Sequence, residues 1–315
     1  MFNLIKDALK TFVIINSICN VNSIISSTPT TTPTTTPTTT PTTTPTTTPT
    51  TTPTTININY PIVVLHGLES SSQQMIPLSN WISDTFNKQV FNIEIGNGER
   101  TSIYSPLTTQ LYELCDTLYN INELSNGFNF IGISQGGLLA RGYVEQCNKY
   151  PVKTLITIVS PHGGIFWKNI KYTNFIYNKK FQTHLSIAGY WRKPTNLNLY
   201  LSKCSYLPII NNEVWTTEVS ETQRINIQNL SNFVMVWSKN DKVLSPPESG
   251  KFSFYDEYFN IIPLDETELY KNDDLGLRFL NNKGGLHIYE TNCSHVDHRN
   301  SICFDQLYDI LNKFI

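Results

Sequence analysis

The sequence predicts an α/β fold in which helices cover both faces of a mostly parallel sheet. Short apolar runs alternate with segments whose apolar residues recur at helical spacing, a pattern typical of parallel strands joined by helices. The chain has 315 residues, and most of them follow a Thr/Pro repeat. The part after the repeat is long enough for one large domain with a buried core.

The N-terminal part has a different composition from the rest. Residues 1–26 predict a secretory signal peptide, because Lys6 and Lys10 precede a short apolar core at 11–18. Residues 27–56 repeat Pro-Thr-Thr-Thr and lack the apolar side chains that a core needs. Their composition is typical of an extended, O-glycosylated stalk. The alternative for the repeat is a simple-sequence expansion without a function.

The globular part, residues 57–315, begins with a buried strand at 62–65. A helix is expected at 105–124, because Pro106 suits a first helical turn and leucines follow at helical spacing. The other expected elements are strands at 90–95, 128–133, 153–159, 233–237 and 286–289, a helix that begins near 138, and a last helix at 302–314.

The strand at 128–133 leads into Gly132-Ile133-Ser134-Gln135-Gly136, and a helical segment follows. This is the G-x-S-x-G pattern of a nucleophile elbow, in which a sharp strand-to-helix turn presents a serine hydroxyl. Glycine is expected at 132 and 136, because a side chain there would collide with the neighbouring strand or helix. The alternative is an ordinary glycine-rich turn.

A serine nucleophile also needs N–H donors for the oxyanion that it creates. The turn after the first strand, His66-Gly67, can present one of them. The expected donors are the backbone N–H groups of Leu68 and Gln135. His66 precedes the serine in the chain, and we interpret it as structural.

The acid and the base of such a site follow the serine in chain order. Asp241 comes directly after the strand at 233–237, and Asp256 and Asp265 are alternatives that follow no comparably clear strand. A carboxylate in this place would hold a histidine in the tautomer that accepts the serine proton.

Three histidines lie near the C-terminus. His287 falls inside a predicted strand and is interpreted as structural. His295 and His298 share the loop before the last helix, and we favour His295 as the base on its position in that loop.

Residues from about 165 to 227 interrupt the alternation of strands and helices and are rich in Tyr, Trp and Phe. A cap that lines an apolar substrate pocket would be inserted at this place. The alternative is a peripheral insertion with a small core of its own.

Composition excludes several classes of function. The net charge is −2 and no basic cluster exists, so we expect no nucleic-acid partner. No apolar run reaches 18 residues, so no transmembrane anchor is expected. No C-x-x-C pair occurs, and we expect no metal and no other cofactor.

Outside the predicted signal, the cysteines suit an oxidising compartment but are odd in number: Cys115, Cys147, Cys204, Cys293 and Cys303. The helices around Cys115 and Cys147 can pack on the same side of the sheet, where either a disulfide or two buried thiols would fit. The pairing of the other three stays open.

Several motifs together resemble the palmitoyl-protein thioesterases over about residues 60–315. The segments that carry the resemblance are Leu65-His66-Gly67-Leu68, the elbow through Gly137 with Ala140-Arg141, Phe252-Ser253-Phe254-Tyr255, residues 264–270 and Asp274-Leu275-Gly276-Leu277. The turn at 160–164, Ser-Pro-His-Gly-Gly, departs from the Ser-Pro-Gln-like turn of the family, and the aromatic insertion is divergent.

The resemblance implies an α/β-hydrolase fold and an enzyme that removes long-chain fatty acyl groups from cysteine thioesters of proteins during lysosomal degradation. It implies Ser134 as nucleophile, Asp241 as acid and His295 as base, and it supports a bridge between Cys115 and Cys147. The implied substrate is an S-acylated protein or peptide or another long-chain acyl thioester.

We therefore expect a monomeric hydrolase in the lysosome or outside the cell, with an N-glycan at the Asn229-Leu230-Ser231 sequon. The second sequon, at Asn292, adjoins His295, and a glycan there would crowd the site. Two alternatives remain: an oxygen-ester lipase or esterase on the same fold, and a stalked surface protein with an inactive hydrolase domain.

Overall fold

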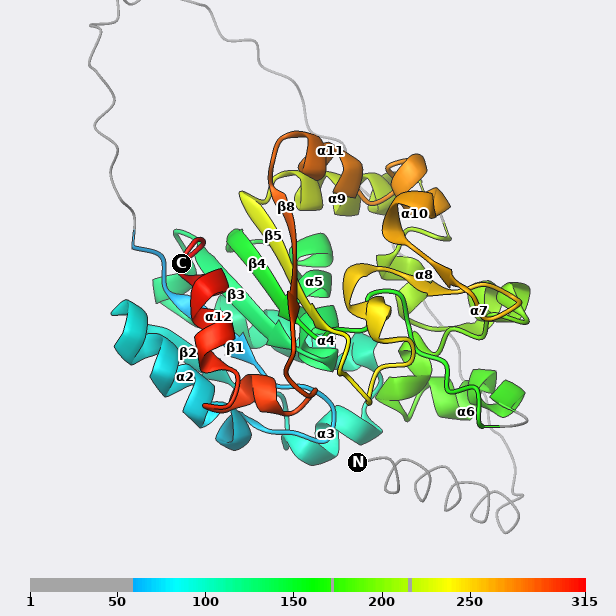
Figure 1. Cartoon of the computed structure of the whole chain (residues 1–315), viewed down its shortest axis with the longest axis horizontal. Coiled ribbons are helices and arrows are strands. Elements are labelled where there is room, and N and C mark those ends of the chain that lie inside the picture. Colours follow the sequence, from blue (N-terminus) through cyan, green and yellow to red (C-terminus); the bar gives the residue numbers. More distant parts are fainter. Residues whose placement is uncertain (1–58, 171–172, 215–216) are drawn as a thin grey trace, which may run out of the picture. The chain divides into compact units, whose positions relative to one another are not determined.

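The computed structural model describes residues 59–170, 173–214 and 217–315 (Figure 1). The predicted signal peptide, 1–26, and the predicted stalk, 27–56, lie outside the described residues. The described chain forms a six-stranded sheet in the order β2-β1-β3-β4-β5-β8, and every neighbouring pair is parallel. The predicted α/β fold with a mostly parallel sheet is confirmed.

The strands of this sheet are β1 (Ile62–Leu65), β2 (Val90–Ile93), β3 (Phe128–Ile133), β4 (Val152–Ile158), β5 (Asn232–Ser238) and β8 (Leu286–Thr291). A separate antiparallel pair is formed by β6 (Phe254–Tyr255) and β7 (Ile261–Ile262). Strands β1 and β3 are buried on both faces, which explains why their sequences are continuous apolar runs rather than alternating ones.

Helices α2 (Ser72–Phe86) and α12 (Phe304–Leu311) lie side by side on one face of the sheet (Figure 1). The rings of Trp81 on α2 and Phe304 on α12 are stacked with their centroids 4.4 Å apart. Helix α2 contains Pro77 and many polar residues, so the sequence pattern did not predict it. Apolar residues at helical spacing, such as Leu78 and Ile82, nevertheless bury one side of it in the core.

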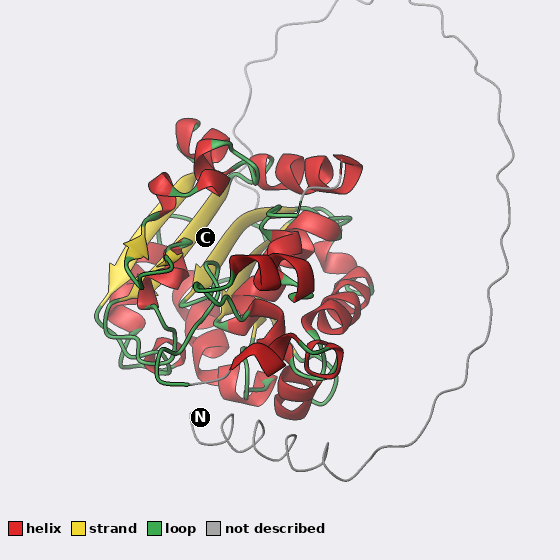
Figure 2. Ribbon diagram, turned by 90° about the vertical axis from the view of Figure 1, so that its right-hand side faces the viewer, coloured by secondary structure: helices red, strands yellow, loops and turns green. Residues whose placement is uncertain are grey.

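The other face carries α4 (Leu107–Tyr119), α5 (Gln135–Gln146) and α9 (Thr217–Gln228). Figure 2 shows the strands enclosed between helices. A disulfide joins Cys115 of α4 to Cys147 at the end of α5, and Asn226 of α9 donates a side-chain hydrogen bond to the carbonyl of Glu145. Helix α9 lies within the insertion expected at 165–227, yet it packs beside α5 in the helix layer.

The described residues 165–170 and 173–214, called the cap segment below, form only short helices. These are η2 (Thr173–Tyr177), α6 (Lys179–Gln182), η3 (Ser186–Tyr190), α7 (Leu197–Lys203) and α8 (Leu207–Ile210). Trp191 is buried at their centre, with the Trp167 ring 5.2 Å and the Phe166 ring 5.7 Å from its own. The aromatic residues of the cap segment thus pack on one another.

The remaining short elements lie on either side of α4 and around the last strands. They are α3 (Glu99–Tyr104), η1 (Asn122–Leu124), η4 (Pro247–Lys251), η5 (Leu264–Glu266), α10 (Glu268–Lys271), α11 (Leu277–Asn282) and η6 (Asp297–Arg299). The expected helix at 105–124 is therefore α4 followed by a separate turn of 3₁₀ helix, η1.

Candidate active site

Ser134 lies on the sharp turn between β3 and α5. Its backbone has φ 55° and ψ −126°, a strained conformation that non-glycine residues rarely adopt. The flanking glycines make the turn possible: a Cβ at Gly132 would lie 2.6 Å from the carbonyl oxygen of Gly136, and one at Gly136 would lie 2.3 Å from that of His66. The N–H of Ser134 donates to the carbonyl of Ile158 at 2.8 Å, which holds the turn against β4.

Three side chains from distant parts of the chain meet at this turn. The Oγ of Ser134 lies 2.9 Å from Nε2 of His295, and Nδ1 of His295 lies 2.6 Å from Oδ2 of Asp241. Both side chains of this contact are buried. With the proton on Nδ1 facing the carboxylate, Nε2 is left to accept the serine proton. The arrangement is that of a serine nucleophile with a general base and an orienting acid.

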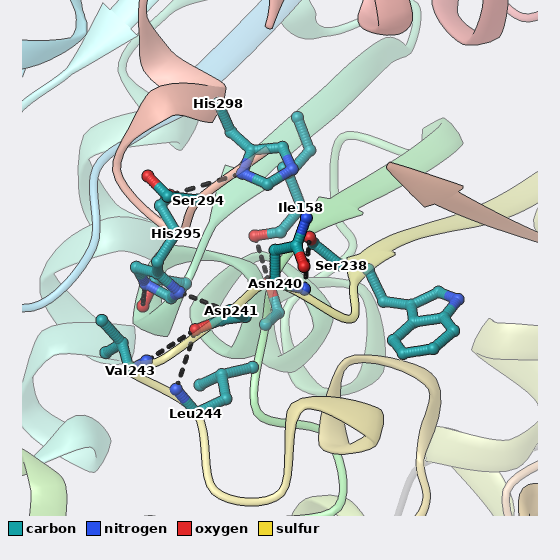
Figure 3. Close-up of polar contacts among 12 residues, drawn as sticks. Ile158, Ser238, Asn240, Asp241, Val243, Leu244, Ser294, His295 and His298 are labelled. Carbon is teal, nitrogen blue, oxygen red and sulfur yellow. Dashed lines mark hydrogen bonds and ion pairs between the residues drawn. The ribbon is translucent and has the colours of Figure 1, made fainter. Parts of the chain in front are cut away.

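The carboxylate of Asp241 is itself held in place by the turn that carries it. Its Oδ1 accepts hydrogen bonds from the N–H groups of Val243 at 2.7 Å and Leu244 at 3.0 Å (Figure 3). The other oxygen, Oδ2, is thereby directed at His295. The sequence suggested the acid from its place after β5 but gave no sign of these two backbone donors.

The alternative residues lie elsewhere. His298 is fully buried, with Nε2 2.7 Å from the hydroxyl of Thr291 and Nδ1 facing the carbonyl of His295. Asp256 accepts hydrogen bonds from Tyr258 and Asn260 within its own exposed turn. Asp265 lies in η5, and no interaction joins it to a histidine within the described residues.

Leu68 follows a glycine that lies against Ser134, and Gln135 follows Ser134 directly in the chain. A Cβ at Gly67 would lie 2.9 Å from the Cβ of Ser134, so the loop that carries Leu68 passes directly over the nucleophile. Gln135 is the first residue of α5, whose first N–H groups have no helical acceptor. Within the described residues neither N–H group donates a hydrogen bond. Both are therefore available to an oxyanion.

Hydrogen bonds to Ser102, Gln110 and Tyr190 hold the side chain of Gln135. Its Nε2 donates to the carbonyl of Ser102 at 2.9 Å, and its Oε1 accepts from the hydroxyl of Tyr190 at 3.2 Å. These contacts connect the oxyanion side of the site to α3 and to the cap segment. His66 is buried with Nδ1 3.0 Å from the carbonyl of Gly67, and burial lowers the pKa of its imidazole. No hydrogen bond joins the His66 imidazole to Ser134 among the described residues.

A buried pair of arginine and glutamate side chains lies on α5. Arg141 Nη1 donates to Glu145 at 3.0 Å and to the carbonyl of Ile210 at 2.8 Å, and its Nη2 donates to Asn211 at 2.8 Å. The guanidinium thus ties the helix behind the nucleophile to α8 of the cap segment. Two opposite charges four residues apart on an otherwise apolar helix were the sequence signal for this network.

Burial raises the pKa of Glu145 to about 8, although Arg141 beside it acts in the opposite direction. Between about pH 5 and pH 8 the carboxyl of Glu145 keeps its proton in the folded protein and loses it in the unfolded chain. The free energy of unfolding should therefore fall as the pH rises through this interval. Wild type should therefore lose stability relative to Glu145→Gln over this interval, by at most about 1.4 kcal/mol per pH unit. Thermal unfolding at pH 5, 6.5 and 8 measures the difference.

The matched control for this prediction is Glu221→Gln. Glu221 forms an exposed pair with Arg224, which lowers the pKa of its carboxyl. The stability difference between wild type and this variant should stay constant between pH 5 and 8. Parallel pH profiles for wild type and Glu145→Gln would contradict the raised pKa.

Two disulfides stabilise the described chain. One joins Cys115 to Cys147, and the other joins Cys293 to Cys303 on either side of the loop that carries His295. The thiol of Cys204 is buried and donates to the carbonyl of Gly189 at 3.1 Å. Cys293, Cys303 and His298 are close enough to share a metal ion, but the disulfide occupies both sulfur atoms.

A pocket of about 560 Å³ lies between the cap segment and the region of β6 and α10. None of the triad residues, Ser134, Asp241 and His295, lines it. Its walls combine apolar side chains such as Leu197, Phe254 and Leu269 with the ion pair of Arg192 and Glu213. The pocket is therefore separate from the site around Ser134. In the part of the chain that the structure describes, no helix has the length and apolar character needed to cross a bilayer.

The family model and the curated relatives agree on one family. The family model described as palmitoyl protein thioesterase matches residues 61–295. Palmitoyl-protein thioesterase 3 of Dictyostelium discoideum is 36% identical over 254 residues, which cover 77% of this chain and 87% of that protein. A Drosophila melanogaster protein named lysosomal thioesterase PPT2 homolog is 30% identical over 250 residues, covering 76% and 85%.

Solved structures with a similar backbone are more distant in sequence. A lipase-esterase related protein from Clostridium acetobutylicum has a TM-score of 0.47 at 11% identity, and the match covers 82% of this chain and 96% of that one. A monoacylglycerol lipase from Paleococcus ferrophilus has a TM-score of 0.47 at 13% identity, with 81% and 95% covered.

Proposed function

Because the chain belongs to the palmitoyl protein thioesterase family, we propose that it hydrolyses long-chain acyl thioesters through Ser134, His295 and Asp241. The observation that carries the proposal is the continuous hydrogen-bond chain from the Ser134 hydroxyl through the imidazole to the buried carboxylate. Family membership identifies the reaction class, and this chain of contacts supports the roles of the individual residues.

In the first half of the reaction, Ser134 Oγ attacks the acyl carbonyl while His295 Nε2 takes the hydroxyl proton. The charge on the carbonyl oxygen is accepted by the N–H groups of Leu68 and Gln135. The C–S bond then breaks, and the leaving sulfur takes the proton from His295. In the second half, His295 removes a proton from water, which attacks the acyl-enzyme, and the fatty acid leaves as the proton returns to Ser134. Asp241 stabilises the imidazolium in both halves.

The proposed substrate is the thioester of a long acyl chain on a protein or peptide cysteine. The support comes from the relatives, which are named palmitoyl-protein and lysosomal thioesterases. We propose that the cap segment lines the acyl site. Aromatic side chains would bind the alkyl chain by burial of apolar surface, which contributes about 0.8 kcal/mol per methylene.

We predict that kcat/KM rises with acyl length by roughly fourfold per methylene until the site is filled. A series of acyl thioesters and matched oxygen esters, from four to eighteen carbons (~2 carbons per step), measures it in one assay. Thioesters should exceed oxygen esters of equal length. A flat length profile would contradict the acyl role of the cap segment, and a preference for oxygen esters would favour the lipase or esterase alternative. Failure of a fluorophosphonate to label Ser134 would favour an inactive domain.

We propose that the enzyme acts in the lysosome or outside the cell, since several relatives are named lysosomal thioesterases. Asn229 follows α9 and is exposed, so its sequon is accessible to glycosylation. Asn292, in the second sequon, is also exposed. However, the next residue, Cys293, forms the disulfide with Cys303, and the carbonyl of Asn292 accepts a hydrogen bond from the side chain of Asn240.

We predict an N-glycan at Asn229 and none at Asn292 when the protein is produced in a eukaryotic secretory host. Glycosidase treatment in heavy-oxygen water followed by peptide mass spectrometry marks each site that carried a glycan. Asn229→Gln should remove the whole mass shift, and Asn292→Gln should leave it unchanged. Secretion without modification at either asparagine would contradict the prediction.

A further inference from the structure

The acid and the base of the site stand on two loops that follow neighbouring strands. Asp241 follows β5 and His295 follows β8, and the ends of these strands are paired at Ser238 and Thr291. The Asp241–His295 contact therefore depends on how the two loops are held relative to each other. A shift of one loop relative to the other would alter the 2.6 Å contact between Asp241 Oδ2 and His295 Nδ1.

One buried hydroxyl connects the two loops. The Oγ of Ser238, the last residue of β5, donates to the carbonyl of Cys293 at 2.7 Å. The same oxygen accepts from the N–H of Asn240 at 3.1 Å (Figure 3). Cys293 lies two residues before the histidine, and Asn240 directly precedes the aspartate. The carbonyl of Ser238 also accepts from the N–H of Asp241 at 3.2 Å.

We propose that Ser238 is a positioning residue that sets the distance between Asp241 and His295. The proposal rests on the proposed function. Ser238 touches no triad side chain, so it acts through the backbone of the two loops. Its serine hydroxyl can donate and accept at once, and an alanine in this place could do neither.

The surroundings explain why this hydroxyl matters. Ser238 is fully buried, so no bulk water can replace its two hydrogen bonds. On the far side Cys293 is anchored by its disulfide to Cys303, which precedes α12. The second link between the loops, from the side chain of Asn240 to the carbonyl of Asn292 at 2.9 Å, is exposed. Of these two links between the loops, the one through Ser238 is protected from solvent.

The test compares Ser238→Ala with Ser238→Thr, which keeps the hydroxyl. A misplacement of about 1 Å in a catalytic group can reduce the rate by about a hundredfold. We expect Ser238→Ala to lower kcat on a long-chain acyl thioester by tenfold or more (~10- to 100-fold) with KM nearly unchanged. The rate constant for fluorophosphonate labelling of Ser134 should fall by a similar factor, and Ser238→Thr should recover most of both losses.

The chain offers a matched control in Thr267. Its buried hydroxyl donates to the carbonyl of Leu264 at 2.6 Å and accepts from the N–H of Tyr270 at 3.2 Å, the same pattern within a segment that has no triad residue. Thr267→Ala should lower the melting temperature as Ser238→Ala does, while kcat measured well below that temperature stays near that of wild type.

The outcomes separate the two proposals. If wild type is neither labelled nor active, the proposed function fails whatever Ser238 does. If wild type is active and the labelling rate of folded Ser238→Ala equals that of Thr267→Ala, the positioning role is overturned. A loss of kcat that Ser238→Thr does not recover, together with a normal melting temperature for that variant, also overturns it.

Discussion

Replacement of Ser134 by alanine should abolish thioester hydrolysis while leaving the fold intact. The nucleophile supplies the covalent step, and members of such a triad act as a unit, so the expected loss of kcat is at least about 10⁴-fold. Alanine retains the Cβ that the strained turn already accommodates at φ 55°, and the N–H bond to Ile158 remains. The measurement is single-turnover kinetics with a long-chain acyl thioester, with circular dichroism as the check on folding.

The matched control is Ser79→Ala. Ser79 is a buried serine on α2 whose hydroxyl has no partner among the described residues, so its removal should neither lower the stability nor change the rate. Near-normal turnover by Ser134→Ala would show that another residue is the nucleophile, and the proposed mechanism would be wrong from its first step.

The second large effect concerns the two histidines of the last loop. We expect His295→Ala to lose at least about 10³-fold in acylation rate, because no other described side chain lies in hydrogen-bond contact with the Ser134 hydroxyl as a base. We expect His298→Ala to retain most of the activity. It removes the buried partner of Thr291 and should lower stability by about 1–3 kcal/mol.

Burst kinetics with an activated thioester distinguish the two variants, because the burst rate reports acylation alone. The assay belongs at a temperature well below the melting point of His298→Ala, so that unfolding does not imitate a loss of catalysis. A severe acylation defect in folded His298→Ala, with His295→Ala nearly normal, would move the base by three residues and leave the nucleophile unchanged.

The elbow around Ser134 could be predicted because its chemistry is local. The buried strand, the tight turn and the helix are formed by consecutive residues. Only glycine fits at positions 132 and 136, where a Cβ would lie 2.3–2.6 Å from backbone atoms. The parallel sheet could be predicted for the same reason, since fully buried strands such as β3 are continuous apolar runs. Helix α2 was not predicted, because Pro77 and the polar residues of this segment interrupt the helical spacing of its apolar residues. The structure shows that the few apolar residues form one buried face against the sheet.

The preference for His295 over His298 had little local basis. Both residues stand in one loop, and their sequence neighbourhoods are alike. The structure distinguishes them by contact: the imidazole of His295 lies between Ser134 and Asp241, and that of His298 is directed at Thr291. The disulfide between Cys293 and Cys303 closes the loop that carries both histidines.

By itself, the sequence determined the α/β fold, the sharp strand-to-helix turn at Ser134 and the membership of a thioesterase family, since each of these depends on residues that are neighbours in the chain or recur at a fixed period. Only the tertiary structure decided which histidine faces the serine, how Arg141 ties α5 to the cap segment, and that Ser238 links the two catalytic loops. The two residues of each contact are separated in the chain by 161, 69 and 55 positions, respectively. No local pattern specifies such pairs, because their distance is set by the packing of the strands and helices between them.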